Sequence, residues 1–121
     1  MDVCVCHYYE LTSGKKPVES FISALSSRGK DKFTYIKRLL EENGNALRQP
    51  YSKYLGHSIF ELRFEGLEGS VRVLYFFLRH DKVVFTNGFI KKTNKIPKKE
   101  LDLSIRRRIE CLKSKLEGEN T

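Results

Sequence analysis

The sequence lacks the features that would place the protein in a membrane or on a secretory route. No apolar run approaches the roughly 18 residues that a membrane-spanning helix needs. Residues 1–16 contain Asp2 and Glu10 and no continuous apolar segment after a basic start, which argues against a secretory signal. A hydrophobic content of 40%, arranged in alternating and helical patterns, argues against disorder. We therefore expect a soluble cytoplasmic protein.

Cysteine is also scarce, with three residues and no Cys-x-x-Cys spacing. Cys4 and Cys6 lie two apart on an expected strand and so share a side, whereas Cys111 lies far away in an expected helix. The three histidines do not combine with the cysteines at the spacing of a zinc finger or ribbon. We expect free thiols and neither a metal nor another cofactor.

Familiar catalytic motifs are missing too. The chain contains no paired-carboxylate site, Ser/His/Asp triplet or nucleotide-binding glycine loop. His57 and His80 have intrinsic pKa values suited to proton transfer, but they fall in an expected loop and an expected turn. A lone histidine in such a segment is more often merely exposed.

What the sequence does have is a local excess of positive charge. Residues 91–115 contain ten Lys and Arg against three Asp and Glu, so a net +7 of the total +8 lies there. The rest of the chain is nearly neutral. Such asymmetry indicates binding to nucleic acid, an acidic membrane surface or an acidic protein, although a solvated basic helix would give the same pattern.

The first half of the chain predicts one strand followed by two helices. Residues 3–9 are β-branched and aromatic, which favours a strand. Pro17 suits the first turn of a helix that Gly29 should end. A second helix then runs to Gly44, which completes a helical hairpin.

The second half predicts a β-meander and a final helix. After a loop marked by Pro50 and Gly56, strands are expected at about 58–65, 70–79 and 82–90. The turns between them are short enough to force antiparallel hairpins. The last helix starts near Pro97, and its apolar stripe consists of Leu101, Ile105, Ile109, Leu112 and Leu116.

This order of elements predicts a single compact α+β domain covering residues 1–121. We expect the helices to cover one face of the sheet and to leave the other face open. On the strand around residue 62, Glu61 and Arg63 share a face because side chains alternate. Arg63 should project from the open face, either in an ion pair with a neighbouring glutamate or as a phosphate contact.

Arg72 lies near the start of the next strand, where Glu61 or Glu65 should hold it across the ladder. Clustered cations without a metal site suit one reaction in particular. RNA is cleaved without metal when its own 2′-hydroxyl attacks the adjacent phosphate, so a protein needs only to position the backbone, move a proton and stabilise the added charge. Arginine supplies a fork for phosphate oxygens, and lysine among other cations can act as a base.

Several short motifs, in order, carry a resemblance to a known family. They are Ser13-Gly14-Lys15-Lys16-Pro17-Val18, Lys53-Tyr54-Leu55-Gly56, Glu61-Leu62-Arg63, Val71-Arg72-Val73-Leu74-Tyr75, Gly88-Phe89-Ile90-Lys91-Lys92-Thr93 and Pro97-Lys98-Lys99-Glu100. The chain resembles the HigB/RelE-type toxins of bacterial type II toxin–antitoxin systems, in particular the phage-derived branch of the RelE/ParE superfamily. The resemblance extends over nearly the whole chain.

The resemblance implies a RelE-like α+β fold and an endoribonuclease, or mRNA interferase, that enters the ribosomal A site and cuts mRNA. It also implies neutralisation by a cognate antitoxin, usually a helix-turn-helix DNA-binding protein. Matched by motif, the catalytic residues would be Arg63, Lys53 and Lys91 or Lys92. Apart from these motif matches, we predict that four further cations contact RNA: Arg72, Lys95, Arg106 and Arg107.

Two features depart from the family pattern. Ile96 stands where a threonine before the proline is common, and the last segment has no tyrosine to stack on a base. The general acid and base therefore stay unassigned. Two other classes remain open: a ParE-like toxin that poisons DNA gyrase, and a non-catalytic module that binds RNA or a protein partner. Lys53, Arg63 and the Lys91-Lys92 pair favour the nuclease over both.

Overall fold

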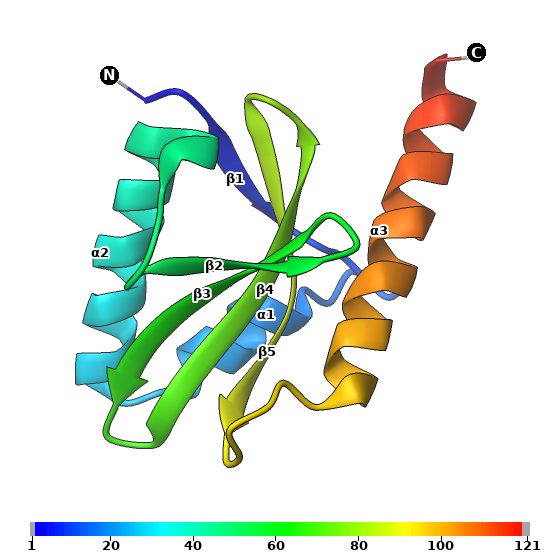
Figure 1. Ribbon diagram of the computed structural model, residues 1–121. Coiled ribbons are helices and arrows are strands. Elements are labelled where there is room, and N and C mark those ends of the chain that lie inside the picture. Colours follow the sequence, from blue (N-terminus) through cyan, green and yellow to red (C-terminus); the bar gives the residue numbers. More distant parts are fainter. Residues whose placement is uncertain (1, 120–121) are drawn as a thin grey trace.

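A five-stranded sheet with helices packed against both faces forms the protein, as seen in the computed structural model (Figure 1). The structure describes residues 2–119, with side chains through residue 114. The strand order is β1-β5-β4-β3-β2. β1 pairs parallel with β5, and the other four strands are antiparallel. Their bounds are β1 Val5–Tyr8, β2 Ser52–Gly56, β3 Ile59–Gly66, β4 Gly69–Arg79 and β5 Lys82–Lys91.

The α+β class, the N-terminal strand, the helical hairpin and the meander of β3, β4 and β5 are confirmed. The sequence did not reveal β2, because Pro50 and Gly56 gave this segment the appearance of a loop. Its five residues pair with β3 and extend the antiparallel part of the sheet to four strands.

The helical hairpin consists of α1 (Pro17–Ser23) and α2 (Ser27–Asn43). Gly29 does not end the first helix as predicted, because it lies buried in the first turn of α2. A Cβ atom at Gly29 would lie 3.2 Å from Cβ of Leu25, so the glycine lets the connection between the two helices pack closely against the first turn of α2. Ser26 caps α2, since its Oγ accepts a hydrogen bond from the Gly29 amide at 3.2 Å. The predicted stop at Gly44 is confirmed, and a short 3₁₀ helix (Gly44–Ala46) follows.

The main hydrophobic core lies between this hairpin and one face of the sheet. Helical side chains such as Val18, Phe33 and Leu40 pack there against strand residues such as Leu62 and Phe85. These residues are almost completely buried, and the aromatic rings of Phe33 and Phe85 meet edge to face, with centroids 5.5 Å apart.

The expectation that helices cover only one face is wrong. α3 (Lys98–Glu119) packs on the opposite face, where Leu101 and Ile105 contact a second cluster of buried strand residues (Figure 1). The face of α3 that packs on the sheet also differs from the predicted apolar stripe, since Ile109 is 45% exposed while Ser104 is fully buried. Ser104 takes this place because its hydroxyl lies 2.6 Å from Oγ1 of Thr86 on β5, which satisfies both polar groups. Leu116 lies beyond the side chains that the structure describes.

Among residues 2–119, no helix combines the length and the apolar character that crossing a lipid bilayer would require.

Candidate functional site

The register of the sheet brings four cationic side chains to the same face. Lys53 on β2 lies opposite Glu61 on β3, and Arg63 lies opposite Arg72 on β4. Lys91, at the end of β5, lies opposite Ser70. Because side chains alternate along a strand and directly opposed residues point the same way, Lys53, Arg63, Arg72 and Lys91 all lie on the face that carries α3. We call these four residues the cation cluster.

A buried carboxylate lies at the centre of the cation cluster. Glu61 is only 1% exposed, with Oε1 3.5 Å from Nε of Arg63 and Oε2 3.9 Å from Nε of Arg72. The expectation that Glu61 holds Arg72 across the ladder is confirmed. Within the described residues, Glu61 Oε2 and Arg72 Nε have no hydrogen-bond partner. Buried polar atoms of this kind are rare in folded proteins, and here the two atoms face each other only as an ion pair, 3.9 Å apart.

The two arginines differ in exposure. Arg72 is 6% exposed and donates a hydrogen bond from Nη1 to the Val71 carbonyl at 3.0 Å. Burial lowers the pKa of the Arg72 guanidinium from its ordinary value, and the Glu61 carboxylate opposes this shift. Arginine stays protonated under physiological conditions even so. The side chain of Arg63 is 30% exposed, so it can contact a ligand from solvent, whereas Arg72 beside it on β4 is buried.

Arg63 and Arg72 line one pocket of about 320 Å³, together with Gln49, Pro50, Phe64 and Glu65. Two guanidinium groups beside a pocket of this size can contact an anion such as a phosphate through several hydrogen bonds. The carboxylate of Glu61 balances part of their charge, which allows the two like charges to lie on neighbouring strands.

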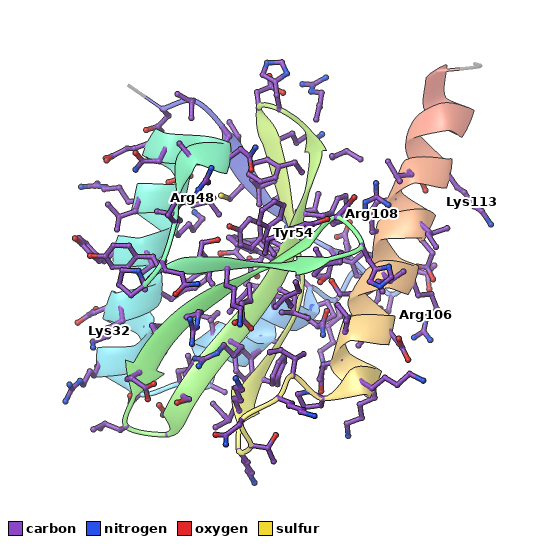
Figure 2. The ribbon with its side chains drawn as sticks, viewed as in Figure 1. Lys32, Arg48, Tyr54, Arg106, Arg108 and Lys113 are labelled. Carbon is purple, nitrogen blue, oxygen red and sulfur yellow. The ribbon has the colours of Figure 1, made fainter. Side chains whose placement is uncertain are left out.

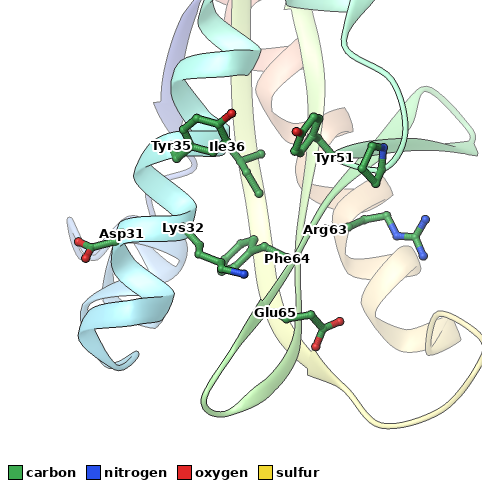
Figure 3. Close-up of a pocket in the computed structure, with 9 residues that line it drawn as sticks. Asp31, Lys32, Tyr35, Ile36, Tyr51, Arg63, Phe64 and Glu65 are labelled. Carbon is green, nitrogen blue, oxygen red and sulfur yellow. The ribbon is translucent and has the colours of Figure 1, made fainter.

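A second, more apolar pocket of about 370 Å³ lies between α2 and the edge of β3. Tyr35 and Ile36 come from α2, and Tyr51 comes from the segment before β2. Figure 3 shows Phe64 pointing toward α2, whereas Arg63 extends in the opposite direction. Four residues, Pro50, Arg63, Phe64 and Glu65, line both pockets, so the apolar pocket and the arginine pocket adjoin.

The other predicted site residues lie outside the cation cluster. Lys92 and Lys95 are exposed in the segment between β5 and α3. Arg106 is exposed on α3 and projects away from the sheet (Figure 2). Arg107 instead fastens α3 to the sheet, since it donates a hydrogen bond to the Thr86 carbonyl at 2.7 Å and its guanidinium lies 4.8 Å from the centroid of the Tyr9 ring.

The two histidines considered for proton transfer are both exposed, and neither lines the arginine pocket. His57 lies in the turn between β2 and β3, where it and Ser58 adopt positive φ angles of 55° and 65°. The apolar pocket between α2 and β3 was not predicted from the sequence. Tyr35 and Tyr51 belong to segments that only the packing of α2 against the sheet brings together, and no spacing in the sequence signals their proximity.

Comparison with protein families gives one match, to the family described as "Phage derived protein Gp49-like (DUF891)", over residues 20–109. The matched region is well over half of the chain and includes the whole cation cluster and both pockets. A search of curated proteins gives no match.

Proposed function

Because the chain belongs to the Gp49-like family of phage-derived proteins, we propose that it is the toxin of a type II toxin–antitoxin system and cleaves mRNA on the ribosome. The resemblance to HigB/RelE toxins supports this proposal on the sequence side. On the structural side, the observation that carries it is the arginine pair over a buried carboxylate, beside two lysines on the same sheet face.

In the proposed reaction the 2′-hydroxyl of one nucleotide loses its proton to solvent or to a basic side chain, and its oxygen attacks the adjacent phosphorus. The bond from phosphorus to the 5′-oxygen of the next nucleotide then breaks, leaving a 2′,3′-cyclic phosphate and a free 5′-hydroxyl. Arg63 and Arg72 would contact the non-bridging oxygens, on which negative charge grows in the transition state. The ammonium groups of Lys53 and Lys91 lie on the same face and can reach the backbone or supply a proton to the leaving oxygen.

Partners follow from the same proposal. The ribosome and its mRNA would meet the cation cluster and the exposed cations of α3, in the cytoplasm where translation takes place. A cognate antitoxin would mask these cations with an acidic amphipathic segment, and it would itself be a helix-turn-helix DNA-binding protein by resemblance.

Mapping of mRNA 5′ ends after induction of the protein tests the proposal. We expect cuts in phase with codons in translated messages, and none in the same message after removal of its start codon. The Arg63→Ala variant, induced to the same level, should give no such cuts. Arrest of DNA synthesis with a DNA-damage response and intact mRNA would instead show a gyrase poison. Intact mRNA together with normal growth would instead indicate a non-catalytic binding module.

A further inference from the structure

The adjoining pockets beside β3 differ sharply in chemistry. The arginine pocket offers guanidinium groups, whereas the pocket between α2 and β3 offers the rings of Tyr35 and Tyr51 and the side chains of Ile36 and Phe64. Arg63 belongs to both. A molecule that fills the two pockets together must therefore combine an anionic group with a flat apolar group a short distance away.

A nucleotide has this composition. We propose that the pocket between α2 and β3 is a nucleobase subsite, which holds one unstacked base of single-stranded RNA while the phosphate of the same nucleotide lies between Arg63 and Arg72. Stacking of splayed bases on aromatic side chains is the usual way in which proteins hold single-stranded RNA. The source of the nucleotide, an mRNA, rests on the proposed function, but the subsite itself follows from the two pockets.

Exposure and geometry of the two tyrosines fit this role. Tyr35 is 56% exposed although it lies in a helix that packs on the sheet. Its ring centroid is 6.4 Å from that of Tyr51 at an interplanar angle of 74°, so the two rings form a corner and do not stack on each other. A base entering this corner can stack on one ring and meet the edge of the other. Lys32 at the rim can contact a neighbouring phosphate of the same strand.

Titration with nucleoside 5′-monophosphates and with ribose 5-phosphate tests the subsite without the ribosome. Both ligands carry the phosphate, and only the first carries a base. We expect at least about fivefold tighter binding of the nucleotides, the lower end of what one stacked base contributes. NMR signals of the Tyr35 ring should shift with the nucleotides and not with ribose 5-phosphate. Equal affinity for both ligands would overturn the proposal.

Two tyrosine variants make the test specific. Tyr35→Ala should remove the preference for the nucleotide and leave affinity for ribose 5-phosphate unchanged, while Tyr35→Phe should keep the preference. Tyr54 is the matched control, since it is also 56% exposed but lies on β2 outside this pocket (Figure 2). A preference that survives Tyr35→Ala, or that Tyr54→Ala removes equally, would overturn the assignment.

A final titration distinguishes RNA from a free nucleotide as the ligand of the subsite. A trinucleotide with 2′-O-methyl groups, which block cleavage, should bind more tightly than the mononucleotide because flanking phosphates reach Lys32 and Lys53. Equal affinity would overturn RNA as the ligand. A base preference in these titrations together with absence of mRNA cleavage in cells would refute the proposed function alone.

Discussion

Arg63 on β3 and Arg72 on β4 face each other directly across the antiparallel ladder. Two like charges in this position repel, and nothing in strand pairing alone favours them. The buried Glu61 carboxylate lies within 3.5 Å of one guanidinium nitrogen and 3.9 Å of the other, which offsets the repulsion without using up their hydrogen-bond donors. Under the proposed function, this arrangement keeps the two guanidinium groups together for the phosphate of the RNA.

Arg63→Ala should abolish most mRNA cleavage and leave the fold intact. The side chain is partly exposed and adds little to the core, whereas a transition-state charge contact contributes roughly 3 kcal/mol, or about a hundredfold in rate. Thermal melting and cleavage would be measured on the same preparation. Arg79→Ala is the control, because this exposed arginine pairs with Asp81 at the far end of β4. A well-folded Arg63→Ala protein that cuts at the normal rate would remove Arg63 from the site.

The Glu61→Gln variant tests whether Glu61 positions the two arginines or only adds negative charge near the RNA, because the two roles predict opposite changes in RNA binding and cleavage. If Glu61 acted only as a negative charge near RNA, its neutralisation would strengthen RNA binding. Because it holds the two arginines in place, we expect cleavage to fall at least tenfold and the free energy of unfolding to fall by about 2 kcal/mol.

The matched control is Glu65→Gln, an exposed carboxylate on the same face of β3 that accepts a hydrogen bond from Ser70 at 2.7 Å. It should leave stability nearly unchanged. Tighter RNA binding and faster cleavage by Glu61→Gln would show that the carboxylate only opposes the ligand.

Lys91 and Lys92 should contribute unequally. Lys91 shares the face of Arg72, while Lys92 follows the end of β5 and is exposed. Lys91→Ala should lower cleavage at least tenfold, about 1.4 kcal/mol, and Lys92→Ala should mainly reduce the salt dependence of ribosome binding. Cleavage rates and binding at two salt concentrations provide the comparison. Small and equal effects would mean that both lysines belong to a diffuse basic surface.

Arg106 and Arg107 on α3 should have different roles. Arg106→Glu should weaken ribosome association and antitoxin capture without loss of stability, and the ribosome effect should diminish at high salt. Arg107→Ala should lower the free energy of unfolding by about 1–2 kcal/mol, because it removes a hydrogen bond to Thr86 and the contact with Tyr9. Pull-downs and urea denaturation would distinguish the two. A stable Arg107→Ala variant would place this arginine on the binding surface as well.

Stability should decline at alkaline pH. Burial raises the pKa of Cys6 to about 12 and that of Tyr75 to about 12, from ordinary values of 9.0 and 10.0. Above pH 9 the unfolded chain therefore loses protons that the folded protein keeps. The stabilisation from these two protonated groups is fully present below pH 9, and the free energy of unfolding falls as pH rises toward 12. Urea denaturation at pH 8 and pH 11 should differ by about 2 kcal/mol or more, and Cys6→Ala should reduce the difference. An identical pH dependence in that variant would exclude Cys6 as a cause.

The sequence by itself determined the α+β class, the hairpins of the meander and the shared face of Glu61 and Arg63, because alternation and short turns are local properties. It also located the excess of positive charge. Only the tertiary structure decided which face α3 covers, where its residues point, and which aromatic side chains meet. Those outcomes depend on burial of apolar surface between segments far apart in the chain. For the same reason the register that sets Arg72 against Arg63, and the packing that brings Tyr35 beside Tyr51, could not be read from spacing.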